Sequence, residues 1–275
     1  MPVSRATAPV IRSGFPRAGS LSGTQKRREF IAALQAVCGD VVRLYVPTLG
    51  DGASITESSP TAATITAVAA PTYSPQGSGV LAVLNGTSQY YTMPDAADMS
   101  FVSLPFSIFA WISLTANAAV KTILARHDLT TGVTNLEWSF HLDAAEKLVG
   151  QCFDDSVGTD VRIGRTFNTA LAADTPMLVV MTYDGLAVNA AVRLYVFDGT
   201  NAGKVDDTDA GSGAFVAMEN KSGLTYIGAR EAASGAATEF FNGSIGPVGL
   251  VAMHLDVNDI QAIRGIGNAF LQLTV

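Results

Sequence analysis

Paired acidic side chains are the first candidates for chemistry, because hydrolysis of a glycosidic bond needs two carboxylates facing each other across a cleft. Glu137 and Asp143 stand six positions apart, with His141 between them in the same strand register. This spacing lacks the closely spaced same-face carboxylates that such a site requires on one strand. We therefore predict that all three are ordinary strand and turn residues, that the chain has no catalytic residue and that it is not an enzyme.

Metal-binding residues are the next candidates. The histidines His127, His141 and His254 stand far apart, without neighbouring ligands at the spacing of a zinc site. Calcium prefers several loop oxygens, so acidic clusters are candidates for that cation. Solvated loop charges are the favoured interpretation, so we predict no metal site and no cofactor, with Ca²⁺ as the alternative. The two clusters are Asp154, Asp155 and Asp160, and Asp206, Asp207 and Asp209.

Aromatic residues offer a stacking surface for sugars at Tyr90, Tyr91, Trp111 and Trp138. Because they fall within strand-like segments, the favoured interpretation is that they belong to the core. The sequence contains no phosphate-binding loop, no Gly-x-Ser-x-Gly elbow and no dinucleotide fingerprint, which excludes the commonest enzyme classes. Sugar binding is therefore an alternative role for this chain.

A basic segment begins the chain. Six basic residues and one acid, Glu29, precede Phe30 and give that segment a formal charge of +5, whereas 11 basic and 23 acidic residues give the rest −12. This asymmetry is typical of an arm that docks on the acidic surface of a neighbour. A protein neighbour is favoured over nucleic acid, because no aromatic stacking platform accompanies the arm. The predicted assembly residues are Arg5, Arg12, Arg17, Lys26, Arg27 and Arg28.

Length and composition leave room for one large domain. Hydrophobic residues make up 48% of the 275-residue chain and charged residues 15%, which is ample material for a core. We expect residues 1–40 to form the basic arm with a short helix, and residues 41–275 to form the main domain. No secretory signal and no transmembrane segment are expected. Cys38 and Cys152 are predicted to be buried or partly buried free thiols.

Two helices are predicted, one before and one after the main run of strands. Thr24 is the expected cap of a helix from about Gln25 to Val37, which is too short to be stable alone. Its apolar stripe is therefore expected to pack on the rest of the chain or on another subunit. A second helix is expected from Val257 to about Phe270, capped by Asp256 or Asn258.

Between the helices the periodicity is that of strands. Phe106–Leu114 carries large apolar groups at alternate positions on both sides, which predicts a strand covered on both faces. Short strands without intervening helices favour an all-β, antiparallel sandwich over a parallel α/β fold. A long polar connection is expected at 47–78, and a hairpin turn at Asn85-Gly86. The other predicted strands are Val41–Val46, Val80–Leu84, Tyr90–Met93, Thr122–Arg126, Leu136–Leu142, Leu148–Phe153, Met177–Tyr183, Val192–Phe197, Leu224–Ala229 and Ile245–Met253.

Five segments, in order, carry a resemblance to a known family. They are LNGTSQYYTMPDAADMSF (Leu84–Phe101), FSIFAWISL (Phe106–Leu114), MTYDG with VRLYVFDG (Met181–Gly185 and Val192–Gly199), LTYIGAR (Leu224–Arg230) and FNGSIGPVG (Phe241–Gly249). Together they resemble the LamG-like jelly roll of the concanavalin A-like lectin and glucanase superfamily, over about Val41 to Leu271. The resemblance implies a jelly-roll β-sandwich whose last two segments form a closing pair. The chain departs from the family at Gly246-Pro247, where an acidic pair is usual, so a cation site is not implied.

The implied fold hosts lectins, glycosidases, adhesion modules and virion proteins. A sandwich of a kind displayed outside cells, the lack of an export signal and a basic arm together favour a virion structural protein, such as a bacteriophage capsid decoration protein assembled in the host cytoplasm. Its expected partners are other virion proteins, bound through the arm, and further copies in a homo-oligomer. The alternative is a carbohydrate-binding, lectin-like module of a tail or fibre, which contacts surface glycans through loops at one end of the sandwich. A glycoside hydrolase is a remote third hypothesis.

Overall fold

The computed structural model describes residues 22–39, 41–56, 63–128, 135–156, 161–232 and 235–275, which form an antiparallel β-sandwich with two helices. The fold class predicted from the sequence, an all-β sandwich of the jelly-roll type, is confirmed. The predicted residues Arg5, Arg12, Arg17 and Asp160 lie outside the described part of the chain. Neither described helix combines the length and the apolar character that crossing a membrane requires.

The strands form two large sheets. The described strands of the eight-stranded sheet are, in order, β14 (Ala202–Lys204), β13 (Val192–Phe197), β12 (Met177–Tyr183), β7 (Phe106–Leu114), β19 (Asn242–Val251), β5 (Gly79–Asn85) and β4 (Thr72–Gln76), with β1 (Val41–Tyr45) paired to β19. Those of the nine-stranded sheet are β15 (Asp207–Asp209), β11 (Arg162–Ala170), β10 (Lys147–Phe153), β9 (Asn135–Leu142), β8 (Lys121–Asp128), β16 (Thr225–Ile227), β6 (Tyr90–Met93), β3 (Thr64–Val68) and β2 (Ser54–Thr56). A separate small hairpin joins β17 (Arg230–Glu231) and β18 (Ala237–Thr238).

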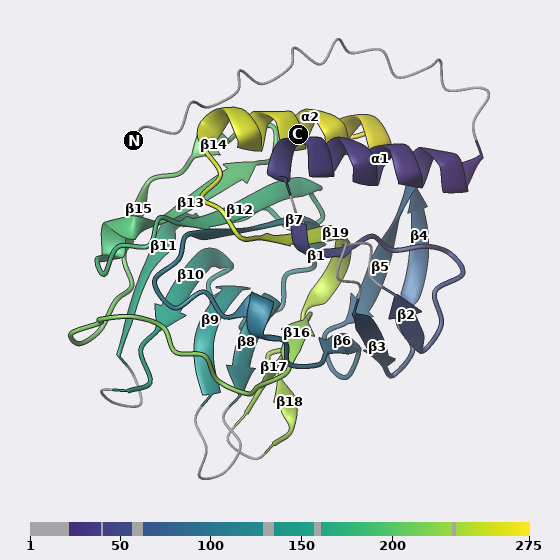
Figure 1. Cartoon of the computed structure of the whole chain (residues 1–275). Coiled ribbons are helices and arrows are strands. Elements are labelled where there is room, and N and C mark those ends of the chain that lie inside the picture. The colour runs from purple at the N-terminus through teal and green to yellow at the C-terminus, as the bar shows by residue number, and fades with distance from the viewer. Residues whose placement is uncertain (1–21, 40, 57–62, 129–134, 157–160, 233–234) are drawn as a thin grey trace.

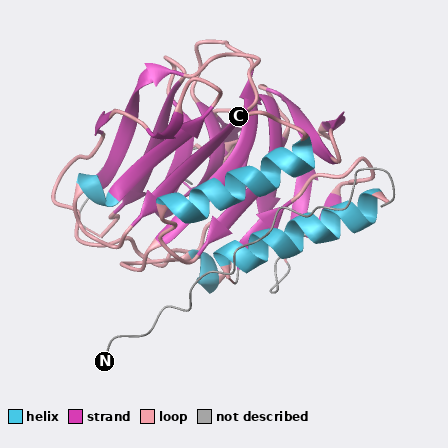
Figure 2. Cartoon of the chain, turned by 90° about the horizontal axis from the view of Figure 1, so that it is seen from above, coloured by secondary structure: helices cyan, strands magenta, loops and turns pink. Residues whose placement is uncertain are grey.

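The molecule has three layers, because both helices cover the same sheet. Helices α1 (Gly23–Cys38) and α2 (Val257–Leu271) lie side by side over the outer face of the eight-stranded sheet (Figures 1 and 2). One apolar cluster joins Phe30 and Leu34 of α1 and Ile263 of α2 to that sheet, and a larger cluster fills the space between the sheets. The stripe predicted on the first helix therefore packs on its own chain.

Strand β7 is buried on both faces, as its sequence predicts. Phe106 and Ile108 point into the cluster between the sheets, whereas Phe109 and Trp111 point into the cluster beneath the helices. Gly267 of α2 permits this contact, because a Cβ at this position would lie 1.8 Å from the indole ring of Trp111. The periodicity of this one strand thus indicates that a further layer covers the sheet.

The long polar connection expected at 47–78 is wrong, because the segment contains β2, β3 and β4. Its strands carry small polar side chains, and Ile55 and Ile65 are the buried apolar anchors of β2 and β3. The alternation of large apolar residues that predicts a strand is therefore weak here. Pairing of β3 with β6, and of β4 with β5, supplies the order that the local sequence does not.

The hairpin predicted at Asn85-Gly86 is also wrong, since β5 and β6 belong to different sheets. The Asn85 side chain accepts hydrogen bonds from the backbone N–H groups of Thr87 and Ser88, and Gly86 has a φ of 70°. These features make a turn, but it carries the chain from one sheet to the other. Likewise the predicted closing pair does not form, because β16 and β19 lie in different sheets.

Both helices begin at side-chain caps. The cap of α1 is Ser22 rather than the predicted Thr24: its hydroxyl accepts from the Gln25 N–H, while the Gln25 side chain accepts from the Ser22 N–H. Asp256 caps α2, as predicted.

Gly246-Pro247, the departure from the family pattern, lies where the register of β19 against β7 shifts, at a β-bulge.

Candidate functional site

The two outer faces of the sandwich differ in what covers them. The helices bury that of the eight-stranded sheet, whereas no described helix lies on that of the nine-stranded sheet (Figure 1). The hairpin of β17 and β18 is its local cover, since β17 contacts β8 and β16. This open face around the hairpin is our candidate functional site.

An aromatic group lies on the open face. Tyr90 and Tyr226 are on the outer side of β6 and β16, because their neighbours Tyr91 and Ile227 point into the core. The Tyr90 ring centroid lies 6.0 Å from that of Tyr226 and 5.8 Å from that of Phe240. Tyr90 and Phe240 are partly exposed, whereas Tyr226 is buried. We call Tyr90, Tyr226 and Phe240 the aromatic platform.

Charged residues of the hairpin border the platform. The hydroxyl of Tyr226 donates to Glu231 at 2.7 Å, and Arg230 forms an ion pair with Glu239. Burial, followed by the charge of Glu231, raises the pKa of Tyr90. Burial also raises the pKa of Glu239, against the lowering effect of Arg230. Glu239 adopts a φ of 52°, a backbone conformation that side chains rarely take and that is enriched at functional sites.

A second group continues the face beyond the hairpin. Arg230 Nη1 lies 3.3 Å from His127 Nε2, and the His127 ring packs edge-on against Phe153 with centroids 5.4 Å apart. Phe153 stands opposite Arg162 in the register of β10 and β11. His141 lies on the same outer side of β9, since its neighbours Phe140 and Leu142 point into the core. We call His127, His141, Arg162 and Arg230 the imidazole–guanidinium cluster.

A cleft of about 670 Å³ shares Arg162 with this cluster, a volume in the usual range of ligand sites. Its polar lining includes Arg165, Asn189 and Asp209. Arg165 pairs with Asp209, and the Asn189 side chain accepts from the Gly164 N–H at 3.0 Å. A glycine-rich wall at 211–213 completes it, because a Cβ on Gly211 would collide with the Asn189 side chain.

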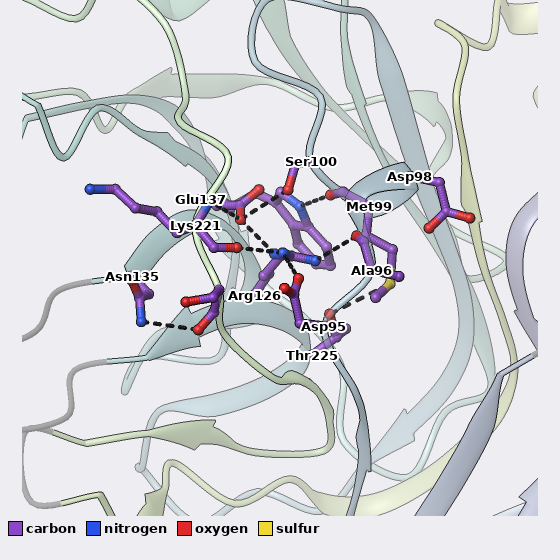
Figure 3. A network of polar contacts seen from close by, with 12 residues as sticks. Asp95, Ala96, Asp98, Met99, Ser100, Arg126, Asn135, Glu137, Lys221 and Thr225 are labelled. Atoms are coloured by element: carbon purple, nitrogen blue, oxygen red, sulfur yellow. Dashed lines mark hydrogen bonds and ion pairs between the residues drawn. The ribbon is translucent and has the colours of Figure 1, made fainter.

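A buried polar network lies elsewhere, at one end of the nine-stranded sheet (Figure 3). Arg126 Nε donates to Glu137 at 2.6 Å, and both side chains are 0% exposed. Arg126 also pairs with Asp95 and donates to the carbonyls of Ala96 and Lys221. The network ties the loops around 95–100 and 221 to β8 and β9, so its role is structural.

The residues tested for hydrolysis do not form a catalytic pair. Glu137 belongs to the buried network, where burial raises its pKa although Arg126 lowers it. His141 lies on the open face, and Asp143 accepts hydrogen bonds from the Ala145 and Lys147 N–H groups in the turn after β9. The structure therefore brings His141 into the candidate site but leaves both carboxylates outside it.

The acidic clusters are engaged by the protein itself. Asp154 accepts from Ser156 and from the Val216 and Ala217 N–H groups, and these bonds lower its pKa although burial alone raises it. Asp207 and Asp209 pair with Arg165. Within the described ranges, no three histidine, cysteine or acidic residues are placed to hold a metal ion. Cys38 and Cys152 are buried free thiols, as predicted.

The aromatic residues considered for sugar stacking divide between core and surface. Tyr91, Trp111 and Trp138 are buried, as the core interpretation predicts, and Tyr90 alone of the four reaches the open face. The sequence interpretation missed its partners Tyr226 and Phe240. The available signal was the charged and aromatic residues at Arg230–Glu231 and Glu239–Phe240, within a stretch otherwise rich in alanine and glycine.

The basic residues predicted for assembly that are described lie on α1. Arg28 is exposed and Lys26 is partly exposed. Arg27 is different, because Nη2 donates to the Val46 carbonyl at 3.3 Å and burial lowers its pKa, although Asp51 raises it. Arg27 therefore anchors α1 to its own chain, which leaves Lys26 and Arg28 as the assembly candidates among the described residues.

Comparison with solved structures places this fold among binding domains and a sialidase. The sequence matches no family model, and no curated protein matches it. The binding domain of botulinum neurotoxin DC, solved in complex with SialylT, is 13% identical and has a TM-score of 0.59. The match covers 84% of this chain and 52% of the neurotoxin chain. The binding domain of Paraclostridial Mosquitocidal Protein 1 is 11% identical, with a TM-score of 0.57 and coverages of 84% and 52%. Trypanosoma rangeli sialidase with sialic acid is 14% identical, with a TM-score of 0.54 and coverages of 91% and 38%.

These likenesses define the fold alone, because the identities are so low. The chain spans about half of the length of the neurotoxin and mosquitocidal binding domains that it matches. It therefore shares a β-sandwich fold with part of each of these proteins.

Proposed function

We propose that this protein is a non-enzymatic, glycan-binding β-sandwich that holds its ligand on the open face of the nine-stranded sheet. The observation that carries the proposal is the aromatic platform, with Tyr90 and Phe240 partly exposed beside the charged hairpin. An aromatic ring presents an apolar face to the C–H groups of a sugar ring, while neighbouring charged groups exchange hydrogen bonds with its hydroxyls.

The site differs from the loop-end contact expected from the sequence. The platform and the cluster form one continuous row across the sheet, from Phe240 and Tyr90 through Glu231 and Arg230 to Phe153. Its partly exposed members are Tyr90, Phe240 and Arg230, whereas Tyr226, Glu231, His127 and Phe153 are buried. The exposed members suit a ligand that extends from the platform to the hairpin, such as an oligosaccharide. The solved neighbours include a binding domain with SialylT and a sialidase with sialic acid, which supports a glycan as one class of ligand.

A glycan array probed with the whole chain in the presence of Ca²⁺ tests this function. We expect binding, and we expect Tyr90→Ala and Phe240→Ala each to weaken it about tenfold, because a lost stacking contact costs ~1.4 kcal/mol. Leu104→Ala is the matched control, since Leu104 is an apolar side chain that is 66% exposed on another loop. An array without signal, or equal binding by all three variants, contradicts the proposal.

A second candidate is a virion structural protein, such as a bacteriophage decoration protein assembled in the host cytoplasm, that binds its neighbours through the basic segment. The charge difference between the first 29 residues, at +5, and the rest, at −12, favours this role. Deletion of residues 1–21, with Lys26→Gln and Arg28→Gln, is expected to abolish incorporation into the particle. Unchanged incorporation contradicts it. The two functions are compatible in one protein.

A further inference from the structure

The imidazole–guanidinium cluster is not explained by stacking on the platform. Its imidazoles are almost covered, with His127 3% and His141 8% exposed, although both lie on the open face. Arg230 Nη1 is 3.3 Å from His127 Nε2, and Arg162 stands across from Phe153, whose ring contacts His127. Two guanidinium groups and two imidazoles therefore gather at the end of the row away from Tyr90.

The charges at this end are dominated by cations. Burial first, and then the positive charges of Arg230, His127 and Arg162, lower the pKa of His141 to about 3. Burial and Arg230 also lower the pKa of Arg162. Among the described residues, the charged groups that shift the pKa of His141 are all basic, even though Glu239 pairs with Arg230. The described charges nearest to His141 are therefore basic ones.

We infer that this cluster is a subsite for the acidic group of a charged sugar, a carboxylate held by Arg162 and Arg230 while the sugar chain extends over the aromatic platform. Guanidinium groups match a carboxylate in both charge and geometry. His141 is neutral at pH 7 because its pKa is lowered to about 3, so it adds no charge that must be buried, and its Nδ1 lies 3.2 Å from Ser139 Oγ. This inference rests on the proposed glycan-binding function and names the class of glycan.

The opposite end of the row sets the direction of the ligand. Glu231 lies against Tyr226 and contributes to the raised pKa of Tyr90, so the platform has a negative neighbour. A carboxylate is repelled there and attracted at Arg162. The neutral part of the glycan therefore belongs on Tyr90 and Phe240, and the acidic sugar on the cluster.

An array that carries sialylated oligosaccharides, oligogalacturonides, glucuronate-containing fragments and their neutral counterparts tests the inference. The best-bound glycan is expected to be acidic, and its methyl ester, which removes only the charge, is expected to bind at least tenfold more weakly at pH 7. A neutral best-bound glycan, or equal affinity for acid and ester, overturns this inference and leaves the proposed function standing. Binding of no glycan overturns the proposed function itself.

Two variants assign the effect to the cluster. Arg162→Gln is expected to lower the affinity for the acid about tenfold and to leave that for the ester within twofold, whereas the exposed Arg28→Gln changes neither. Loss of both affinities in parallel by a folded Arg162→Gln overturns the assignment. Arg230→Gln/Glu239→Gln removes a cation together with its paired carboxylate, so it gives the same test without an unpaired charge if Arg162→Gln fails to fold.

Discussion

Two arginine–glutamate pairs of this molecule differ in their exposure to solvent and in how many protein groups the arginine contacts. Arg126 and Glu137 are both 0% exposed, and the arginine reaches a second carboxylate and two backbone carbonyls of its own chain. Arg230 and Glu239 are 23% and 18% exposed at the border of the open face. Arg230 contacts one carboxylate and the imidazole of His127.

The difference teaches that the same two residue types serve stability in one place and recognition in the other. A sealed pair with many partners holds separate segments together, and it leaves no donor for a ligand. A pair at the border of the open face leaves the arginine partly exposed, so its guanidinium can meet a ligand. The first pair is therefore expected to control stability, and the second is not.

The largest effect is expected from Arg126→Met. Removing one partner of a buried ion pair leaves Glu137 without its counter-charge, which costs about 3–5 kcal/mol of the free energy of unfolding. Urea denaturation measures this loss. Arg193→Met is the matched control, since Arg193 is 39% exposed and pairs with Asp184 at 3.5 Å. A loss below ~1 kcal/mol in Arg126→Met contradicts a structural role for the network.

An intermediate effect is expected from pH, through His141. Its folded-state pKa of about 3 lies below the ordinary value of 6.5. Between these two pH values His141 is protonated in the unfolded chain and neutral in the folded chain. The contribution of His141 to the free energy of unfolding is therefore fully present above pH 6.5. It is lost as the pH is lowered toward 3, by about 1.4 kcal/mol per pH unit. Between pH 7 and pH 5 this amounts to ~2 kcal/mol.

Urea denaturation of the wild type and of His141→Asn at both pH values isolates that contribution. The variant is expected to lose less stability than the wild type on going to pH 5. His254→Asn is the comparison: burial and Arg193 also lower the pKa of His254, but this side chain is partly exposed, so its variant is expected to change the pH dependence less than His141→Asn does. Equal pH dependence in the wild type and in His141→Asn contradicts a buried, neutral His141.

The sequence predicts best those strands whose large apolar residues alternate against a core. β6, β7, β12 and β13 have the predicted bounds, and each carries buried aromatic or branched side chains. β2, β3 and β4 are not predicted, because their small polar residues give little apolar alternation and pairing with neighbouring strands is what mainly orders them. β11 was missed as well, since Gly164 and two arginines interrupt its apolar pattern. The sequence also does not assign strands to sheets, because an Asn-Gly turn can connect two strands of one sheet or two strands of different sheets.

The candidate site was less predictable than the fold. Tyr90 and His141 were noticed, but their partners come from strands and a hairpin that are far apart in the sequence. Arg230 and Glu239 face one another because β17 pairs with β18. Such proximity depends on sheet order and on the path of the hairpin over β8, neither of which periodicity encodes. Local sequence patterns thus indicate well which residues are buried, and poorly which residues from distant segments come together.

The smallest effect on stability is expected from Arg230→Gln/Glu239→Gln. Partly exposed ion pairs contribute about 0–1 kcal/mol, so the free energy of unfolding of this double variant should stay within that range of the wild type. Urea denaturation measures it beside Arg126→Met. A loss as large as that of Arg126→Met contradicts the contrast between the two pairs, because the hairpin pair then holds the fold together. A small loss accompanied by weaker glycan binding assigns the pair to the open face, since only a ligand then depends on its charges.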